Sequence, residues 1–310
     1  MRYLAAMPPS QTPQGNTLAG IALMLGAMIV LPFLDVVAKI LGQQNVPIIE
    51  IVWARLFFGM VMSAPMVWKF EGARGLIPRR PVIHMIRATF LVAATGLFFW
   101  ALKFQGIAET LAIFFVQPLV ITMLSPLVLG EKVGVRRWLA VVVGFMGTLI
   151  IIRPGFQSLN PGVFMALGAG TSLALYMLLT RRIAGGAGAM TTTFLTSLAG
   201  AVLTTIAVVF VWQTPTPQQW WLFLLLAFIA TLGHYLIVRA YDYAEASLLA
   251  PLGYTEMIMA VVVGWYFFGD FPDIWTFVGV GILIVCAIYI SYRERVRNVA
   301  PLETPPTMIS

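Results

Sequence analysis

Ten apolar segments, joined by short polar connections, occupy almost all of this 310-residue chain. A helix needs about 20 apolar residues to cross the hydrocarbon core of a bilayer, and most of the segments have about that length. The sequence therefore predicts an all-α integral membrane protein with ten transmembrane helices. The expected helices are 18–41, 47–69, 82–103, 107–129, 137–152, 161–182, 190–212, 218–239, 244–268 and 274–292.

Composition supports lipid, rather than water, as the solvent for most of the chain. Hydrophobic residues make up 60% of it and charged residues only 10%, against about 25% charged residues in soluble domains. The net charge of +7 does not indicate nucleic-acid binding, because Lys and Arg lie in short clusters between apolar segments. The single cysteine, Cys286, has no disulfide partner.

The positive charges predict how the chain crosses the bacterial inner membrane. The first apolar segment is too long for a cleaved signal peptide, so we expect it to be retained. If both termini are cytoplasmic, most of the 19 Lys and Arg residues lie on the cytoplasmic side. Only Lys39, Lys103 and Arg153 lie on the other side, and Arg55 and Arg87 fall within helices. This asymmetry favours ten helices with both termini inside.

The chain contains a weak internal repeat. At one constant offset, several residues of the first half match residues of the second half in type and order. The matched pairs are Ala101 with Ala240, Phe104 with Tyr243, Gln117 with Glu256, and Gly130-Glu131 with Gly269-Asp270. Five helices per repeat is an odd number, so the second repeat must enter the membrane inverted, which is typical of transporters with a midplane binding site. The predicted division is a tail at 1–17, repeats at 18–154 and 155–292, and a tail at 293–310.

Several motifs carry a resemblance to a known family. The first half contains Ala101-Leu-Lys-Phe-Gln-Gly-Ile-Ala108, then Gln117-Pro118, then Gly130-Glu131-Lys132, and it closes with Val143 to Pro154. This pattern resembles the EamA repeat of the drug/metabolite transporter superfamily. The resemblance implies a ten-helix inverted fold without ATP hydrolysis. It also implies a substrate among those of the family, which include drugs, amino acids, nucleotide sugars, S-adenosylmethionine and riboflavin.

Two polar residues at matched repeat positions are the leading candidates for substrate binding. Gln117 and Glu256 each lie about 10–12 residues into an expected helix, near the midplane, where an inverted-repeat cavity is expected. Gln117 offers donors and an acceptor, and Glu256 can bind substrate or carry a proton. The structural alternative is that Glu256, in its protonated form, bonds a neighbouring helix.

A second pair of intramembrane residues is predicted at a common depth. Asp35 and Arg55 lie roughly 9 and 12 Å from the outer surface, at about 1.5 Å per residue. An ion pair between them would reduce the cost of burying both charges. It could act as an outer gate, as a substrate anchor or as a fixed clamp between helices.

Aromatic residues and prolines complete the candidate site. Tyr254, Tyr176 and Trp100 could line the cavity and stack on a flat substrate, although aromatic residues also anchor helices at the bilayer surface. Pro118 and Pro251 could act as hinges, or could serve ordinary packing.

Two other polar residues are interpreted structurally. We expect His234 to be a packing residue. We expect Arg87 to extend to the lipid headgroups.

Taken together, these features predict a secondary carrier with no catalytic residues, metal or cofactor. The sequence has no phosphate-binding loop for ATP. The expected partners are a small-molecule substrate and the bilayer, and a homodimer is left open. Riboflavin uptake is the favoured prediction, with S-adenosylmethionine, amino-acid or drug transport as alternatives. A membrane enzyme or a channel would be functions of another class.

Overall fold

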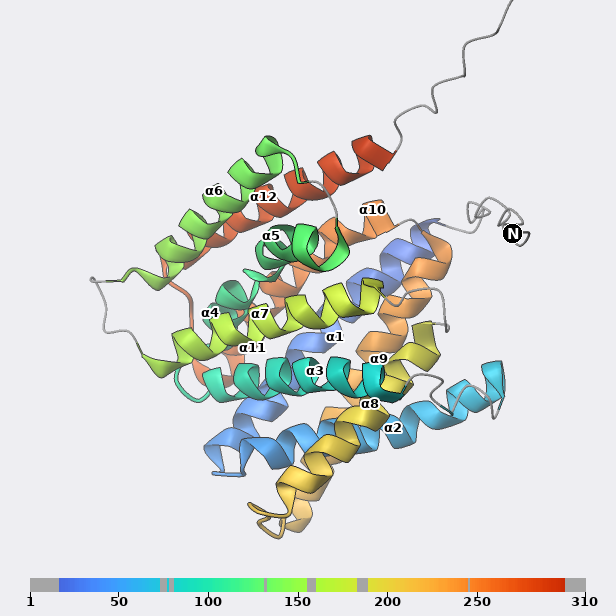
Figure 1. Cartoon of the computed structure of the whole chain (residues 1–310). Helices are drawn as coiled ribbons and strands as arrows, with labels where there is room; N and C mark the ends of the chain where they lie inside the picture. The colour runs from blue at the N-terminus through green and yellow to red at the C-terminus, as the bar shows by residue number, and fades with distance from the viewer. Residues whose placement is uncertain are drawn as a thin grey trace, which may run out of the picture.

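The computed structural model describes residues 17–72, 77, 81–130, 133–154, 160–182, 189–244 and 246–298, and its regular elements there are helices (Figure 1). The expected N-terminal tail lies outside these ranges apart from Thr17, and so does the expected C-terminal tail beyond the end of the last helix. The α-helices are α1 (Thr17–Gln43), α2 (Ile48–Glu71), α3 (Pro81–Ala101), α4 (Ile107–Phe114), α5 (Gln117–Leu129), α6 (Val135–Ile152), α7 (Pro161–Arg182), α8 (Ala189–Val208), α9 (Pro217–Tyr243), α10 (Ala246–Leu249), α11 (Glu256–Phe268) and α12 (Ile274–Asn298), and the 3-10 helix η2 (Ala250–Thr255) lies between α10 and α11.

The helices have the length and surface of a membrane bundle. In the described ranges, eight helical stretches are long and apolar enough to cross a bilayer, and the shorter stretches Leu252–Phe268 and Ile274–Ile290 correspond to the last two expected crossings. Large apolar side chains on the outer faces are uncovered, including Leu127, Phe210 and Trp221 at 82%, 83% and 73% exposure. Such surfaces are stable next to lipid, as expected for an integral membrane protein.

The fourth and ninth expected helices are both interrupted, which the sequence analysis did not predict. The fourth breaks after Phe114 and resumes as α5 at Gln117. The ninth consists of α10, then η2, then α11, which begins at Glu256. Pro118 therefore lies in the first turn of α5, where a missing N–H breaks no helical hydrogen bond, and Pro251 lies in η2. Neither proline interrupts a continuous α-helix.

The two halves of the chain run in opposite directions through the bundle. Lys39, near the end of α1, bonds Asp270 between α11 and α12, and Arg153, at the end of α6, bonds Asp273 in the same connection. Gly162, at the start of α7, lies against Ala101 and Phe104, next to the Gln105 carbonyl group that Lys39 bonds. The end of α1 and the start of α7 therefore lie at one end of the bundle, here called the Lys39 end. The opposite end, where α1 starts and α9 and α12 finish, is here called the Arg239 end (Figure 1).

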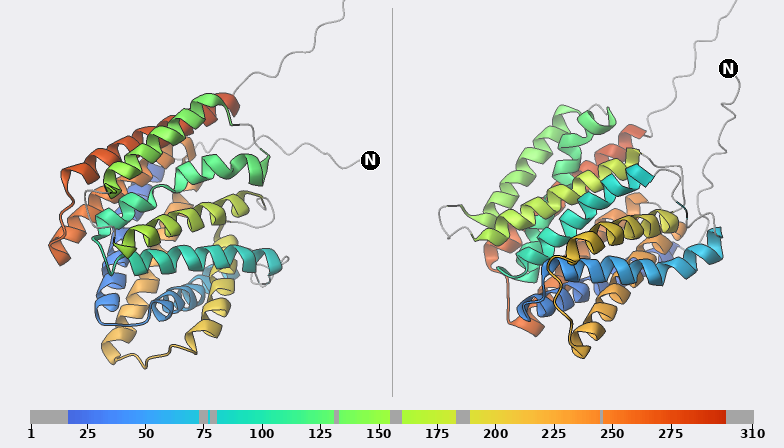
Figure 2. Two further views of the ribbon diagram at one scale, coloured as in Figure 1. Left: turned by 60° about the vertical axis from the view of Figure 1, so that its left-hand side comes forward. Right: turned by 60° about the horizontal axis from the view of Figure 1, so that its bottom comes forward.

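The helix pairs with the largest contacts join one half to the other. These are α1 with α9, α3 with α7, α2 with α8, and α6 with α12, and the pairs lie side by side in Figures 1 and 2. Each of these helices has a counterpart in the other half: α1 corresponds to α7, α2 to α8, α3 to α9, and α6 to α12. Replacing each helix by its counterpart turns the α1–α9 pair into the α7–α3 pair. The α2–α8 and α6–α12 pairs map onto themselves. This pattern agrees with an inverted repeat.

Glycines allow α6 and α12 to approach closely. A methyl group added at Gly279 would lie 2.6 Å from the Gly147 carbonyl oxygen and would also overlap the Ile151 side chain. Gly281, two residues further along α12, has open space around its Cα. Small residues at such contacts let membrane helices pack backbone to backbone.

The Gly279→Ala variant should therefore destabilise the protein, whereas Gly281→Ala should not. Overpacking a tight contact costs about 1–3 kcal/mol, and alanine in an open helical position gains up to about 1 kcal/mol over glycine. The thermal unfolding midpoints of the two purified variants in detergent test this expectation. Equal midpoints would show that the α6–α12 contact does not contribute to stability as described.

Candidate functional site

A cavity of about 400 Å³ lies between the two halves of the bundle. Its walls come from α1, α2, α3 and α4 of the first half and from α7, α8, α9 and α11 of the second. This volume lies in the range of small-molecule binding sites. The polar side chains in the wall are Asp35, Arg55, Ser63, Thr95, Tyr176, Thr193, Thr196, Ser197, Thr231, His234, Tyr235 and Glu256.

The charged groups of the cavity come from three helices. Asp35 lies on α1 and is only 5% exposed, Arg55 lies on α2, and Glu256 is the first residue of α11. The Asp35 carboxyl group interacts electrostatically with both Glu256 and Arg55. Neither carboxyl group has an ion-pair partner in the part of the chain that the structure describes.

The expected direct ion pair between Asp35 and Arg55 is not formed. Arg55 Nη1 instead donates a hydrogen bond to Thr95 Oγ1 on α3, at 2.6 Å. The guanidinium group also lies 6.0 Å from the centre of the Phe99 ring. Arg55 is thus held against α3, which provides both a hydroxyl acceptor and an aromatic face.

Of the residues that the sequence suggested for substrate contact, Tyr176 and Glu256 reach the cavity wall and three do not. Gln117 is behind the wall, where its Nε2 donates to the sulfur of Met177 at 2.8 Å, and Met177 itself lines the cavity. Tyr254 packs edge-on against Phe115, with ring centres 5.2 Å apart.

Trp100 does not line the cavity and so cannot stack on a substrate there. It is close to the last residue of α3 and is 46% exposed on the outer surface. This position suits an aromatic anchor at the bilayer surface.

Other wall residues were not distinguishable in the sequence. His234, interpreted as a packing residue, lines the cavity from α9. Its Nδ1 donates to the Ala230 carbonyl oxygen at 2.7 Å, which leaves Nε2 for other partners. Hydroxyl residues such as Thr95 resemble every other threonine in an apolar helix, and only their direction in the bundle identifies them.

Arg87 corrects a second expectation. It does not extend to the lipid headgroups, because its side chain is fully buried and its Nη2 donates to Thr196 Oγ1 on α8 at 2.7 Å. Arg87 therefore joins the two halves next to the cavity.

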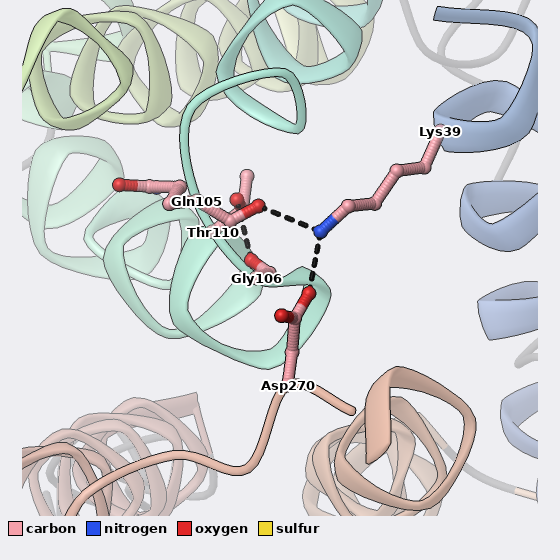
Figure 3. Close-up of polar contacts among 5 residues, drawn as sticks. All are labelled: Lys39, Gln105, Gly106, Thr110 and Asp270. Carbon is pink, nitrogen blue, oxygen red and sulfur yellow. Dashed lines mark hydrogen bonds and ion pairs between the residues drawn. The ribbon is translucent and has the colours of Figure 1, made fainter. Parts of the chain in front are cut away.

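The Lys39 end is closed by contacts between the two halves (Figure 3). Lys39 Nζ donates to Asp270 Oδ2 at 2.6 Å and to the Gln105 carbonyl oxygen at 3.1 Å. The lysine is 8% exposed, and its ammonium group lies 4.8 Å from the centre of the Phe268 ring. A buried ammonium group is stable only with such partners. The Lys39–Asp270 ion pair therefore holds α1 of the first half against the α11–α12 connection of the second.

A second ion pair reinforces this closure. Arg153 contacts Asp273, which also accepts hydrogen bonds of 2.9 Å from the backbone N–H and the hydroxyl group of Thr276 at the start of α12. Burial acts to raise the pKa of Asp273, but the hydrogen bonds from Thr276 and the Arg153 charge outweigh it and hold this pKa below its ordinary value. Asp273 therefore stays ionised at neutral pH, and the second ion pair persists.

Comparison with known proteins gives a family for this arrangement. The sequence profile of the EamA-like transporter family matches the chain twice, at residues 18–153 and 160–292. The chain belongs to the EamA-like transporter family.

Two relatives of this EamA-like transporter are named for different substrates. It is 26% identical to an S-adenosylmethionine uptake transporter of Rickettsia bellii, over 84% of this chain and 89% of that protein. It is 30% identical to a riboflavin transporter of Vibrio cholerae, over 70% of this chain and 75% of that protein. A solved structure that is 19% identical superposes with a TM-score of 0.61, over 92% of this chain and 98% of the other, which supports the fold. The EamA-like transporter is thus an integral inner-membrane protein that moves small metabolites.

Removing one partner of the Lys39–Asp270 pair should destabilise the protein more than removing both. Lys39→Met leaves a carboxylate without its cation, and Asp270→Asn leaves a buried ammonium group without its anion. We expect a coupling free energy of about 1–2 kcal/mol from a double-mutant cycle of thermal or denaturant unfolding. Lys103→Met, at an exposed lysine of the same end, is the matched control and should change little. Additive effects of the two substitutions would contradict a stabilising pair.

Proposed function

We propose that this chain is a secondary transporter that carries a small metabolite with a cationic group into the cell, with S-adenosylmethionine as the leading candidate. The observation that carries the proposal is the pair of carboxyl groups, Asp35 and Glu256, in the wall of a cavity between the halves. A buried carboxyl group without a cation keeps a proton, whereas a bound sulfonium or ammonium group allows it to ionise. Such a site therefore favours a positively charged ligand.

Riboflavin, which the sequence favoured, is the second candidate. The relative of 30% identity that is named a riboflavin transporter supports it, and Phe98, Phe99 and Phe114 could pack on a flat ring. A neutral flavin, however, carries no cation that would allow the Asp35 and Glu256 carboxyl groups to ionise. This difference in charge makes S-adenosylmethionine the better candidate.

Alternating access is the mode of transport that best suits the packing. The contacts at the Lys39 end include two ion pairs between the halves, Lys39–Asp270 and Arg153–Asp273. In the described residues, the ion pair at the Arg239 end joins Arg239 to Asp242 within a single helix. We propose that the halves first separate at the Arg239 end, and that transport requires the Lys39 end to open in turn. With the orientation that the positive charges predict, the Arg239 end is cytoplasmic.

Uptake into proteoliposomes tests the carrier and its substrate together. Radiolabelled S-adenosylmethionine should enter with saturation, and unlabelled S-adenosylmethionine inside the vesicles should accelerate the entry. Excess riboflavin should compete weakly. Entry without saturation or counter-transport would indicate a channel. Saturable riboflavin uptake without S-adenosylmethionine uptake would replace the substrate and leave the carrier in place.

Substitution of Glu256 should weaken S-adenosylmethionine binding. Loss of a charge-assisted contact costs about 1.5–3 kcal/mol, so Glu256→Gln should raise the KM for uptake by about 10- to 100-fold. Asp242→Asn removes an exposed carboxylate at the Arg239 end and is the matched control. An unchanged KM in Glu256→Gln, with normal protein in the membrane, would remove Glu256 from the substrate site.

A further inference from the structure

The Arg87 guanidinium group is buried without an anionic partner. Its side chain is completely inaccessible, yet Nε and Nη1 have no hydrogen-bond partner. Its remaining contacts are the 2.7 Å hydrogen bond to Thr196 Oγ1, a longer one of 3.4 Å to the Tyr176 hydroxyl group, and the Tyr176 ring face, 5.3 Å from the guanidinium carbon. No carboxylate within the described ranges forms an ion pair with it.

This arrangement is costly for a residue that only packs helices together. A buried cation without a counter-charge loses its hydration and gains only partial compensation from hydroxyl groups and an aromatic ring. His84, one turn earlier on α3, interacts with the Arg87 charge but cannot neutralise it. An uncompensated positive charge therefore lies directly behind the wall of the cavity.

The two hydroxyl groups that contact Arg87 both belong to residues of the cavity wall. Thr196 uses its own hydrogen to bond the Thr192 carbonyl oxygen, at 2.7 Å. The Tyr176 oxygen faces Arg87 as an acceptor, so its hydrogen is directed elsewhere and no described group accepts it. A phenol whose oxygen faces a cation is a stronger donor, and its natural partner is an anionic oxygen.

We propose that Tyr176, positioned and polarised by Arg87, forms a subsite for the carboxylate group of a zwitterionic metabolite. The Tyr176 hydroxyl group contacts the substrate carboxylate. Arg87, on the far side of Tyr176, positions this hydroxyl group and supplies the positive charge that compensates the carboxylate. The inference rests on the proposed function, in which Asp35 and Glu256 take the cationic part of the same molecule. One cavity then recognises both ends of an amino-acid group.

Binding of two ligands that differ only in the carboxylate tests the subsite. Purified protein in detergent is titrated with S-adenosylmethionine and with its decarboxylated analogue. The wild-type protein should bind S-adenosylmethionine about 10- to 100-fold more tightly, as expected for a charge-assisted contact. In Tyr176→Phe and Arg87→Gln this preference should fall below about threefold, through weaker binding of S-adenosylmethionine alone. Arg87→Lys, which keeps the charge, should retain part of the preference.

Each other outcome overturns the inference. If the wild-type protein binds both ligands equally, there is no carboxylate subsite, while the proposed function stands. If the preference survives in Tyr176→Phe, Tyr176 is not the donor, and this variant decides the matter even if Arg87→Gln does not fold. If both ligands weaken equally in the variants, the roles of Arg87 and Tyr176 are structural. If the wild-type protein binds neither ligand but carries riboflavin, the proposed function fails as well.

Discussion

A charge inside a lipid-embedded bundle must find its partner within the protein, and this constraint shapes the whole molecule. Lys39 illustrates it, because a lysine within a membrane helix bonds Asp270 of the other half and the Gln105 carbonyl oxygen between α3 and α4. Separating the two halves at this end would leave the Lys39 ammonium group unpaired, and the free-energy cost of doing so holds the halves together there. The glycine contact between α6 and α12 adds close packing without polar groups. Stability thus comes from contacts between the repeats.

In and next to the cavity, by contrast, ionisable groups lack an ion-pair partner within the described protein. Asp35 and Glu256 lack ion-pair partners in the described structure, and Arg87 lies behind the wall with two unpartnered nitrogen atoms. A substrate that carries both charges would compensate both kinds of group at once. Binding energy would then come from polar groups that the empty protein does not pair internally.

Sequence reasoning predicted the family, the all-helical membrane fold and the approximate positions of the crossings. These follow from the lengths of the apolar segments and from the repeated motifs, which can be read from the sequence alone. Sequence reasoning also selected Asp35, Arg55 and Glu256, because a polar residue in an apolar run must face the interior, and Tyr176 as an aromatic residue that could stack on a substrate. It did not predict the breaks before Gln117 and Glu256. Nor did it predict that Arg87 turns inward, since the direction of a side chain around a helix depends on which neighbours pack there. The partnership of Lys39 with Asp270 joins residues far apart in sequence, and only the fold brings them together.

In the proposed mechanism, transport requires the two halves to separate at the Lys39 end. Gly106 and Asp270 belong to opposite halves, and a Cβ atom built on Gly106 would lie 3.3 Å from that of Asp270, close to the separation in a disulfide. A Gly106→Cys, Asp270→Cys double variant can therefore be cross-linked, in a Cys286→Ala background that removes the chain's single native cysteine. Uptake of S-adenosylmethionine into proteoliposomes is then measured before and after reduction, with riboflavin as a second substrate. We predict that the oxidised protein carries neither substrate and that reduction restores uptake. Equal uptake by the oxidised and reduced forms would contradict the account.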